Sequence, residues 1–255
     1  MIRGFYTARS GLMTHQEHMN TIANNMANAN TVGFKPMRSA FKDLIYQNIN
    51  RQKGENTAML GHGVKINKND IMMHQGALEP TDMPFDFAIL EEGGFFAVQN
   101  KATEEIRYTR AGDFRLSNED GTYMLVTGEN EYVLDSDGNT IEVEEPEYEE
   151  VVNPDGSTGV GDLLNPFDPS VIGVYRFQNP WGLESRGGNA YSETEMSGPA
   201  EAIEEPAVKQ SYLERSATYI ADEMVNVIES QKAFSFSARM VQVADEVEQT
   251  INQLR

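Results

Sequence analysis

The sequence contains no cysteine. This absence excludes a disulfide scaffold, a zinc site with thiolate ligands and a cysteine nucleophile. No apolar run reaches the roughly 20 residues that a helix needs to cross a bilayer. Residues 1–30 also lack the continuous apolar core of a secretory signal, because polar and apolar residues alternate from Ile2 to Leu12. If the protein leaves the cytoplasm, we expect it to do so without a cleaved signal peptide.

Basic residues are scarce: the chain has 20 Lys and Arg against 40 Asp and Glu, for a net charge of −20. This balance argues against binding to nucleic acid. The charge is uneven, because residues 104–150 contain fifteen acids and three arginines, which is typical of a solvated surface. Residues 1–53 contain seven bases and two acids, whereas residues 207–255 contain five bases and seven acids. Opposite net charges at the two ends of the chain favour terminal segments that pack against each other.

Apolar residues recur at heptad spacing at both ends of the chain. Near the start, two rows of the repeat are apolar except for His15. They consist of Phe5, Ala8, Leu12, His15, Met19, Ile22, Met26 and Ala29. Near the end, a stripe alternates steps of four and three: Leu213, Ala217, Ile220, Met224, Val227, Gln231, Phe234, Ala238 and Val241. One such stripe would fit a helix lying on a globular core, but two narrow stripes favour a coiled coil. We therefore predict paired helices at residues 1–30 and 211–255.

Between the helices the pattern changes to a period of two. Residues 85–89 and 141–144 alternate strictly, and Asn, Asp and Gly at residues 118–121 and 135–139 suit tight hairpin turns. We predict an antiparallel all-β domain over residues 75–205 with an acidic loop at 144–169. The connecting segment at residues 31–74 has room for a short helix after Pro36. The predicted fold class is therefore α+β.

The sequence shows no arrangement typical of a chemical site. His15 and His18 could share a metal on a helix, but no third ligand lies nearby, so we interpret them as surface residues. The segment from Asp135 is similar to a calcium loop in part, yet Gly138 comes one place early and Pro146 replaces the bidentate Glu, which favours a hairpin. Phosphate loops and nucleophile elbows are missing. We expect no enzyme activity, no metal and no cofactor.

Four asparagines lie within seven residues, from Asn24 to Asn30. Asn is a mediocre helix former, because its side chain competes for the backbone's hydrogen bonds. We interpret the cluster as the end of the first helix, where carbonyl groups lose their partners. The amides of Asn24, Asn25 and Asn28 are expected to tie this end to a loop or to another subunit. Fraying with local turn bonds is the alternative.

Four stretches resemble those of the bacterial flagellar axial proteins, the family of rod, hook and hook-associated proteins. They are residues 22–35 (IANNMANANTVGFK), 81–100, 108–121 and 211–255, in the order that the family has. The first residues and the modest length favour the distal rod over the hook, whose protein usually has a larger outer domain. The segment before the last helix departs from the family pattern, because Ser211 replaces an expected glycine and an Asn-Val pair is missing.

The resemblance implies a structural subunit that polymerises into the tubular drive shaft carrying torque from motor to hook, without catalysis. Implied partners are further copies of the chain, neighbouring rod and hook proteins, the flagellar export apparatus and a bushing ring or the cell wall, but neither nucleic acid nor a membrane interior. The implied location is the basal body outside the inner membrane. The residues expected at subunit interfaces are Phe5, Leu12, Met19, Ile22, Asn24, Asn25, Met26, Asn28, Gly33, Phe34, Leu213, Ile220, Met224, Val227, Phe234 and Val241.

Two alternatives stay open. The chain could be another axial subunit, from the proximal rod or the hook. It could also be a secreted wall-binding module or enzyme on an axial-type scaffold. The acidic loop is the one feature that supports this alternative. An enzyme would have a deep polar pocket with perturbed titratable groups. A rod subunit would instead expose long apolar seams on its helices.

Overall fold

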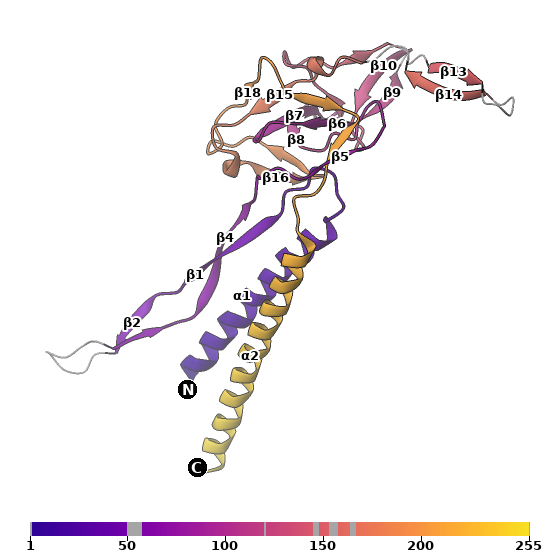
Figure 1. Ribbon diagram of the computed structural model, residues 1–255. Helices are drawn as coiled ribbons and strands as arrows, with labels where there is room; N and C mark the ends of the chain where they lie inside the picture. Colours follow the sequence, from indigo (N-terminus) through magenta and orange to yellow (C-terminus); the bar gives the residue numbers. More distant parts are fainter. Residues whose placement is uncertain are drawn as a thin grey trace. The chain divides into compact units, whose positions relative to one another are not determined.

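The computed structural model describes residues 2–49, 58–119, 121–144, 148–152, 158–163 and 167–254 (Figure 1). The chain forms two compact units. The first unit comprises Met1–Ala29, Pro36–Met72 and Thr218–Arg255. The second comprises Asn30–Lys35 and Met73–Ala217. Both units therefore combine segments that are far apart in the sequence.

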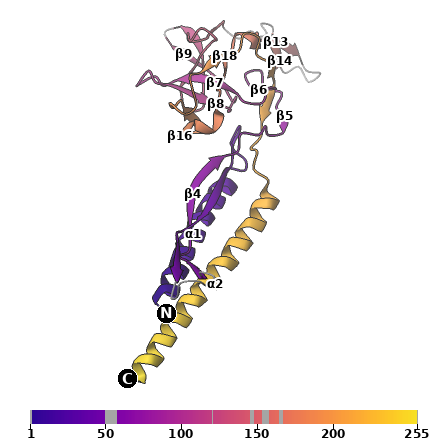
Figure 2. The ribbon, with the colours of Figure 1, turned by 90° about the vertical axis from the view of Figure 1, so that its left-hand side faces the viewer.

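The first unit is built on two long helices, α1 (Ile2–Ala27) and α2 (Ile220–Gln253). They lie side by side and run in opposite directions, so that the two chain termini lie at the same end of the pair (Figures 1 and 2). Asp222 and Glu223 occupy the first turn of α2, where the helix dipole favours negative charge. Among the described residues, neither helix is long and apolar enough to span a bilayer.

A two-stranded ribbon completes the first unit. Strand β1 (Met37–Asp43) pairs antiparallel with β4 (Val64–Ile71), with an irregularity between Ala40 and Phe41. Strand β2 (Tyr46–Ile49) pairs with β3 (Ala58–Gly61). A short helix after Pro36 is not what forms, because residues 64–71 supply an extended partner for residues 37–43. Tertiary pairing here overrides the local sequence preference.

The second unit is a β-structure with two short 3₁₀ helices, η1 (Pro169–Val171) and η2 (Pro180–Gly182). Its described strands are short and pair antiparallel: β5 (Leu78–Pro80), β6 (Phe87–Ile89), β7 (Gly94–Gln99), β8 (Ile106–Thr109), β9 (Arg115–Glu119), β10 (Thr122–Val126), β11 (Tyr132–Val133), β12 (Glu142–Val143), β13 (Tyr148–Val152), β14 (Thr158–Leu163), β15 (Val174–Arg176), β16 (Glu184–Gly187), β17 (Ala190–Ser192), β18 (Glu201–Ala202), β19 (Val208–Gln210) and β20 (Tyr212–Glu214). The predicted α+β class is confirmed.

The largest sheet has the order β12-β10-β11-β7-β8-β17-β16, and β9, β15 and β18 pair alongside it. The last two strands pair with the first two of this unit, β19 with β6 and β20 with β5. The chain therefore closes the second unit by bringing its end back to its beginning.

The acidic segment predicted as a loop at residues 144–169 contains a hairpin. Strands β13 and β14 pair antiparallel, with Val152 opposite Thr158. Residues 145–147, 153–157 and 164–166 of this segment lie outside the described residues. Strand pairing thus occurs within a segment for which the acidic charge and turn residues predict an irregular loop.

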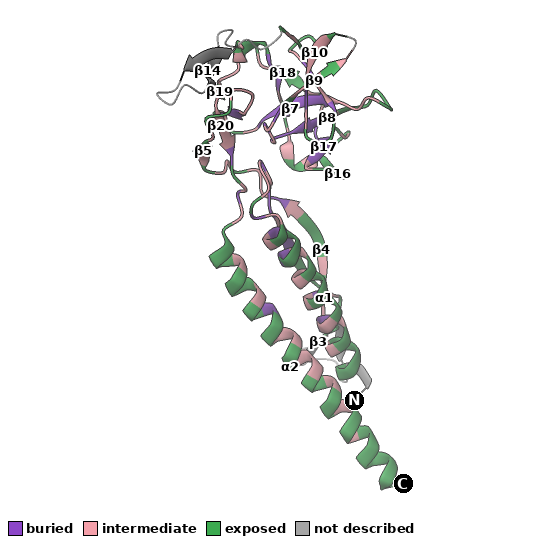
Figure 3. Cartoon of the chain, turned by 90° about the vertical axis from the view of Figure 1, so that its right-hand side faces the viewer, coloured by how far each residue is buried: buried purple, intermediate pink, exposed green. Residues whose placement is uncertain are grey.

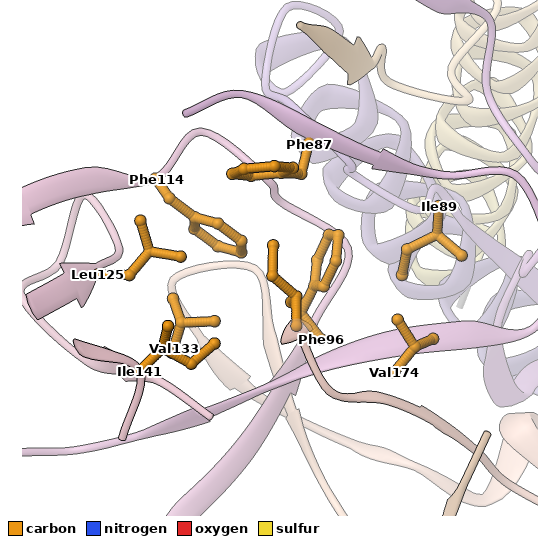
Figure 4. Packing of buried hydrophobic residues seen from close by; sticks show 9 residues of the cluster. Phe87, Ile89, Phe96, Phe114, Leu125, Val133, Ile141 and Val174 are labelled. Atoms are coloured by element: carbon orange, nitrogen blue, oxygen red, sulfur yellow. The ribbon is translucent and has the colours of Figure 1, made fainter. Parts of the chain in front are cut away.

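The hydrophobic core lies in the second unit (Figure 4). Phe87, Phe96 and Leu125 are completely buried there. The rings of Phe96 and Phe114 meet edge to face with centroids 5.1 Å apart, a favourable arrangement for aromatic side chains. The remaining buried members of the cluster are Ile89, Val133, Ile141, Ile172 and Val174. These residues come from several strands, so the core holds the sheet together.

Candidate functional site: helix surfaces and buried junctions

Helix α1 contacts both α2 and the β1–β4 ribbon in the first unit. Toward the ribbon, the Thr14 hydroxyl donates to the Val64 carbonyl over 3.0 Å. The Ser39 hydroxyl donates to Thr21 Oγ1 over 3.2 Å. These contacts are polar, so this side of α1 is fixed by directional bonds as well as by packing.

Small side chains let α1 and α2 approach closely. A methyl group placed on Gly11 would lie 3.1 Å from Ser237 Oγ. Ser230, one heptad before Ser237, is buried. On the adjacent row of α2, the half-buried apolar residues are also one heptad apart: Val227, Phe234 and Val241. The side of α2 that faces α1 therefore alternates small and large residues at heptad spacing.

The amide of Asn25 is a junction of three elements of the first unit. Its Nδ2 donates to the Met37 carbonyl over 2.8 Å, and its Oδ1 accepts from the Met37 N–H over 2.9 Å. Nδ2 also donates to Glu223 Oε1 over 2.7 Å. Asn25 is only 1% exposed. One side chain thus binds the start of β1 and the first turn of α2 to α1, which answers why an amide occupies this helical position.

The neighbouring asparagines Asn24 and Asn28 bond to each other. The Asn28 amide donates to the Asn24 carbonyl over 2.9 Å and lies 3.3 Å from Asn24 Oδ1. The backbone N–H of Asn28 also donates to the Asn24 carbonyl. Asn24 and Asn30 are exposed. The cluster therefore combines a buried junction at Asn25 with turn bonds at the helix end.

Much of both helices is exposed (Figure 3), and the exposed residues include large apolar ones. On α1 the exposed large residues are Phe5, Tyr6 and Met13. On α2 they are Ile220, Met224, Val225, Ile228, Phe236, Met240, Val243 and Ile251, and Leu254 follows directly after the helix. Because the half-buried row of α2 is apolar as well, this helix has apolar residues on several sides. Helices of this kind are normally buried by a further partner.

The residues expected at subunit interfaces take different positions. Ile22 is buried in the first unit, and the half-buried ones there are Leu12, Met19, Met26, Val227, Phe234 and Val241. Phe5, Ile220 and Met224 are exposed. Leu213 lies in β20 of the second unit, before α2 begins. Gly33 and Phe34 also belong to the second unit, so the expected set is divided between the two units.

A buried ionic cluster in the second unit was not foreseen. Glu214 Oε1 lies 2.6 Å from Lys35 Nζ, and Glu214 Oε2 lies 3.0 Å from Arg110 Nη1. All three side chains are 1% exposed. Burial lowers the pKa of the Lys35 ammonium, and the Glu214 carboxylate opposes that shift. The sequence analysis predicts a helix from residue 211, whereas Glu214 lies in strand β20, so local sequence patterns do not bring it together with Lys35 and Arg110.

Glycine allows the close packing around this cluster. Gly33 has a φ of +64°, and a methyl group there would lie 2.5 Å from the Arg110 carbonyl carbon. Gly76 donates its N–H to Glu214 Oε1 over 2.7 Å. A methyl group on Gly76 would lie 2.0 Å from the Arg215 carbonyl oxygen. Backbone and ionic groups are thus packed together with no room for larger residues.

His15 and His18 pack against an aromatic ring. Their ring centroids lie 5.9 and 5.0 Å from that of Phe41 in β1. The Nδ1 atoms of both histidines are buried without a hydrogen-bond partner in the described structure. Burial lowers the pKa of His15 and of His18. Within the described ranges, no group of three or more His, Asp or Glu side chains could hold a metal ion.

Three family models match segments of the chain. Residues 5–35 match "Flagella basal body rod protein", and residues 209–254 match "Flagellar basal body rod FlgEFG protein C-terminal". Residues 89–160 match "Flagellar hook protein FlgE/F/G D1 domain". The first match contains Asn25 and Lys35, and the second contains Glu214, Glu223 and α2. The charged and amide side chains of both junctions therefore lie within the matched segments, whereas their backbone partners Met37 and Gly76 lie outside them.

Similar proteins extend over the whole length. The flagellar basal-body rod protein FlgG of Bacillus subtilis is 32% identical, and all of both chains is covered. The protein of the same name from Borreliella burgdorferi is 34% identical over all of this chain and 99% of its own. The flagellar hook-basal body complex protein FlhP of Bacillus subtilis is 27% identical over both full lengths. The chain therefore belongs to the flagellar basal-body rod protein family and is a structural subunit of the distal rod.

Proposed function

We propose that copies of this chain assemble into the distal rod through the exposed apolar faces of α1 and α2. The observation that carries the proposal is the distribution of apolar residues on α2, which has large side chains on its exposed face as well as toward α1. An exposed apolar surface along a helix of 34 residues is costly in water. Neighbouring subunits in a tube would cover it.

We further propose that α1 and α2 pair as a coiled coil. The heptad spacing of Ser230 and Ser237 and the parallel row of Val227, Phe234 and Val241 support this geometry. Gly11 opposite Ser237 supports an unusually close approach of the two helices at that level. The exposed apolar residues would then make contacts between such pairs.

The second unit is proposed to form the outer layer of the rod. It contains thirty Asp and Glu against nine Lys and Arg, whereas the first unit contains ten against eleven. A net charge of −21 on one unit favours contact with water or with a basic partner. A bushing ring or a wall component of basic character would fit this surface.

We infer the route and location from the family. A rod subunit of this type would be exported by the flagellar apparatus without a cleaved signal peptide and would assemble outside the inner membrane, next to neighbouring rod and hook proteins. An export step would require an unfolded chain, and the absence of cysteine suits such a chain because no disulfide must form afterwards.

The experiment compares two double variants in a strain that lacks the gene. Phe236→Asp with Val243→Asp places charge on the exposed apolar face of α2, at positions one heptad apart. Ser235→Asp with Gln242→Asp adds the same charge at exposed polar positions with the same spacing. We expect the first pair to give basal bodies with truncated rods in electron microscopy, and the second to give complete rods.

Circular dichroism of the purified variants separates assembly from folding. Because the substituted side chains are exposed, both double variants should retain the helix content of the parent. Complete rods in the Phe236→Asp, Val243→Asp strain would contradict the proposal.

A further inference from the structure

The carboxylate of Glu214 connects four segments of the second unit. It accepts from Lys35 Nζ over 2.6 Å, from Arg110 Nη1 over 3.0 Å and from the Gly76 N–H over 2.7 Å. The backbone carbonyl of the same residue accepts from the Gly33 N–H over 2.7 Å. One residue near the end of the unit thus binds its first segment, the start of its second segment and the residue that directly follows β8.

The cluster has two cations and one anion. Lys35 Nζ and Arg110 Nη2 each have one further acceptor, the carbonyls of His74 and Glu91, at 2.7 and 2.8 Å. These carbonyls satisfy hydrogen bonds but carry no net charge. Among the described residues, Glu214 supplies the carboxylate that bonds directly to both buried cations, whereas the exposed carboxylate of Glu92 acts on them at longer range. A second unit without Glu214 would hold two cations in its interior with no directly bonded counter-charge.

The position of Glu214 in the chain is as informative as its contacts. It lies in β20, which pairs with β5, and the preceding β19 pairs with β6. Three residues later, the Ala217 N–H donates to the Phe34 carbonyl over 3.0 Å. The two ends of the second unit thus lie side by side. When the chain is synthesised or exported from its N-terminus, Glu214 is among the last residues of this unit to appear.

We propose that Glu214 is a closing residue, whose charge keeps the second unit from folding until the C-terminal part of the chain is present. Before residue 214 arrives, formation of the core would bury Lys35 and Arg110 near each other without a directly bonded carboxylate, leaving only the exposed Glu92 at longer range. The unit therefore folds late, when only the last 41 residues remain. This property concerns the folding of the chain and does not depend on the proposed assembly, although an exported subunit would benefit from it.

The charge can be separated from the shape by three single variants of the full chain. Glu214→Gln keeps the size of the side chain but leaves two buried cations, whereas Lys35→Met leaves one cation paired with one carboxylate. Glu205→Gln is the control, because Glu205 is an exposed carboxylate of the same unit. Hydrogen exchange of the amides in β6 and β7 reports on the core of the second unit, and exchange in α1 reports on the first unit.

We expect Glu214→Gln to lower the protection of β6 and β7 about a hundredfold or more, since unpairing a buried ion is strongly destabilising. Lys35→Met should lower this protection far less, and Glu205→Gln should leave it unchanged. Equal loss of protection in Glu214→Gln and Lys35→Met would overturn the proposal, because the number of unpaired cations would then not matter. Unchanged protection in Glu214→Gln would overturn it as well.

The timing is tested by pulsed hydrogen exchange during refolding of the full parent chain. If Glu214 closes the unit, amides of β7 and of β20 become protected in the same kinetic phase. Protection of β7 well before β20 would show that the core forms without the carboxylate and would refute late closure. Failure of rod assembly in the α2 surface variants would not affect either outcome.

Discussion

The two units of this rod protein bury apolar side chains in opposite ways. The second unit encloses a core of completely buried residues, such as Phe87 and Phe96. In the first unit, the single buried residue of α2 is a serine, Ser230, although the helix spans 34 residues. The second unit is thus stabilised by its own core, whereas the first keeps much of its apolar surface available for partners.

The two units also differ in net charge. The first is almost neutral, and the second carries a net charge of −21 from thirty acids and nine bases. Neutral apolar surfaces associate readily, while like-charged surfaces repel each other. The comparison suggests a division of labour, with cohesion between subunits in the first unit and solubility in the second.

The largest expected effect comes from truncating matched aromatic residues in the two units. Phe96→Ala should lower the free energy of unfolding of the second unit by about 3–5 kcal/mol, because Phe96 is completely buried in the core. Phe236→Ala should change the stability of the free chain by only about 0.5 kcal/mol, because Phe236 is exposed on α2. Denaturant unfolding followed by near-ultraviolet absorption and by helix content measures both. Similar losses for the two variants would remove the distinction between the units.

An intermediate effect is expected for the junction that organises the first unit. Asn25→Ala removes a buried side chain with three hydrogen bonds to Met37 and Glu223. It should lower the stability of the first unit by about 1–3 kcal/mol, since the buried partners lose their bonds. Asn20→Ala, at an exposed position of the same helix, is the control. Hydrogen exchange should show the loss in α1 and β1, with β7 unaffected; equal losses in both units would mean that they do not fold independently.

How much of this could be predicted from the sequence depends on the range of the interaction. The terminal helices and the β-rich middle follow from apolar periodicity, which is local. The heptad row of Val227, Phe234 and Val241 stands out in the sequence because its residues are large and apolar, and these residues are half-buried in the structure; their place at subunit interfaces stays a prediction. Its companion row of Ser230 and Ser237 was missed, since small polar residues give no periodic apolar signal.

The buried junctions could not be predicted because their partners are distant in sequence. Asn25 bonds to Glu223, and Lys35 to Glu214, across more than 170 residues. The apolar stripe continued through Leu213 and Ala217, so the last helix was predicted to begin at residue 211 instead of at Ile220. Pairing of β20 with β5 overrides that local pattern.

The smallest expected effect is a dependence on pH that belongs to the first unit alone. Burial lowers the pKa of His15 and of His18 in the folded chain, so that near pH 6 the folded state binds fewer protons than the unfolded state. Stability should therefore fall as pH decreases from 7.5 through the pKa of an unfolded histidine, about 6.5. Glu223 of α2 partly counteracts the lowered pKa of His18, which keeps the effect small.

Thermal unfolding at several pH values, followed through the helical signal, measures this dependence. The double variant His15→Gln, His18→Gln should lose the decrease between pH 7.5 and 5.5 relative to the parent, whereas His62→Gln, an exposed histidine of the same unit, should keep it. Hydrogen exchange in β6 and β7 should respond identically in all three proteins, because His15 and His18 belong to the first unit. A pH response that survives the double substitution would place its origin in carboxylates and would weaken the view that polar contacts tune the first unit separately from the core of the second.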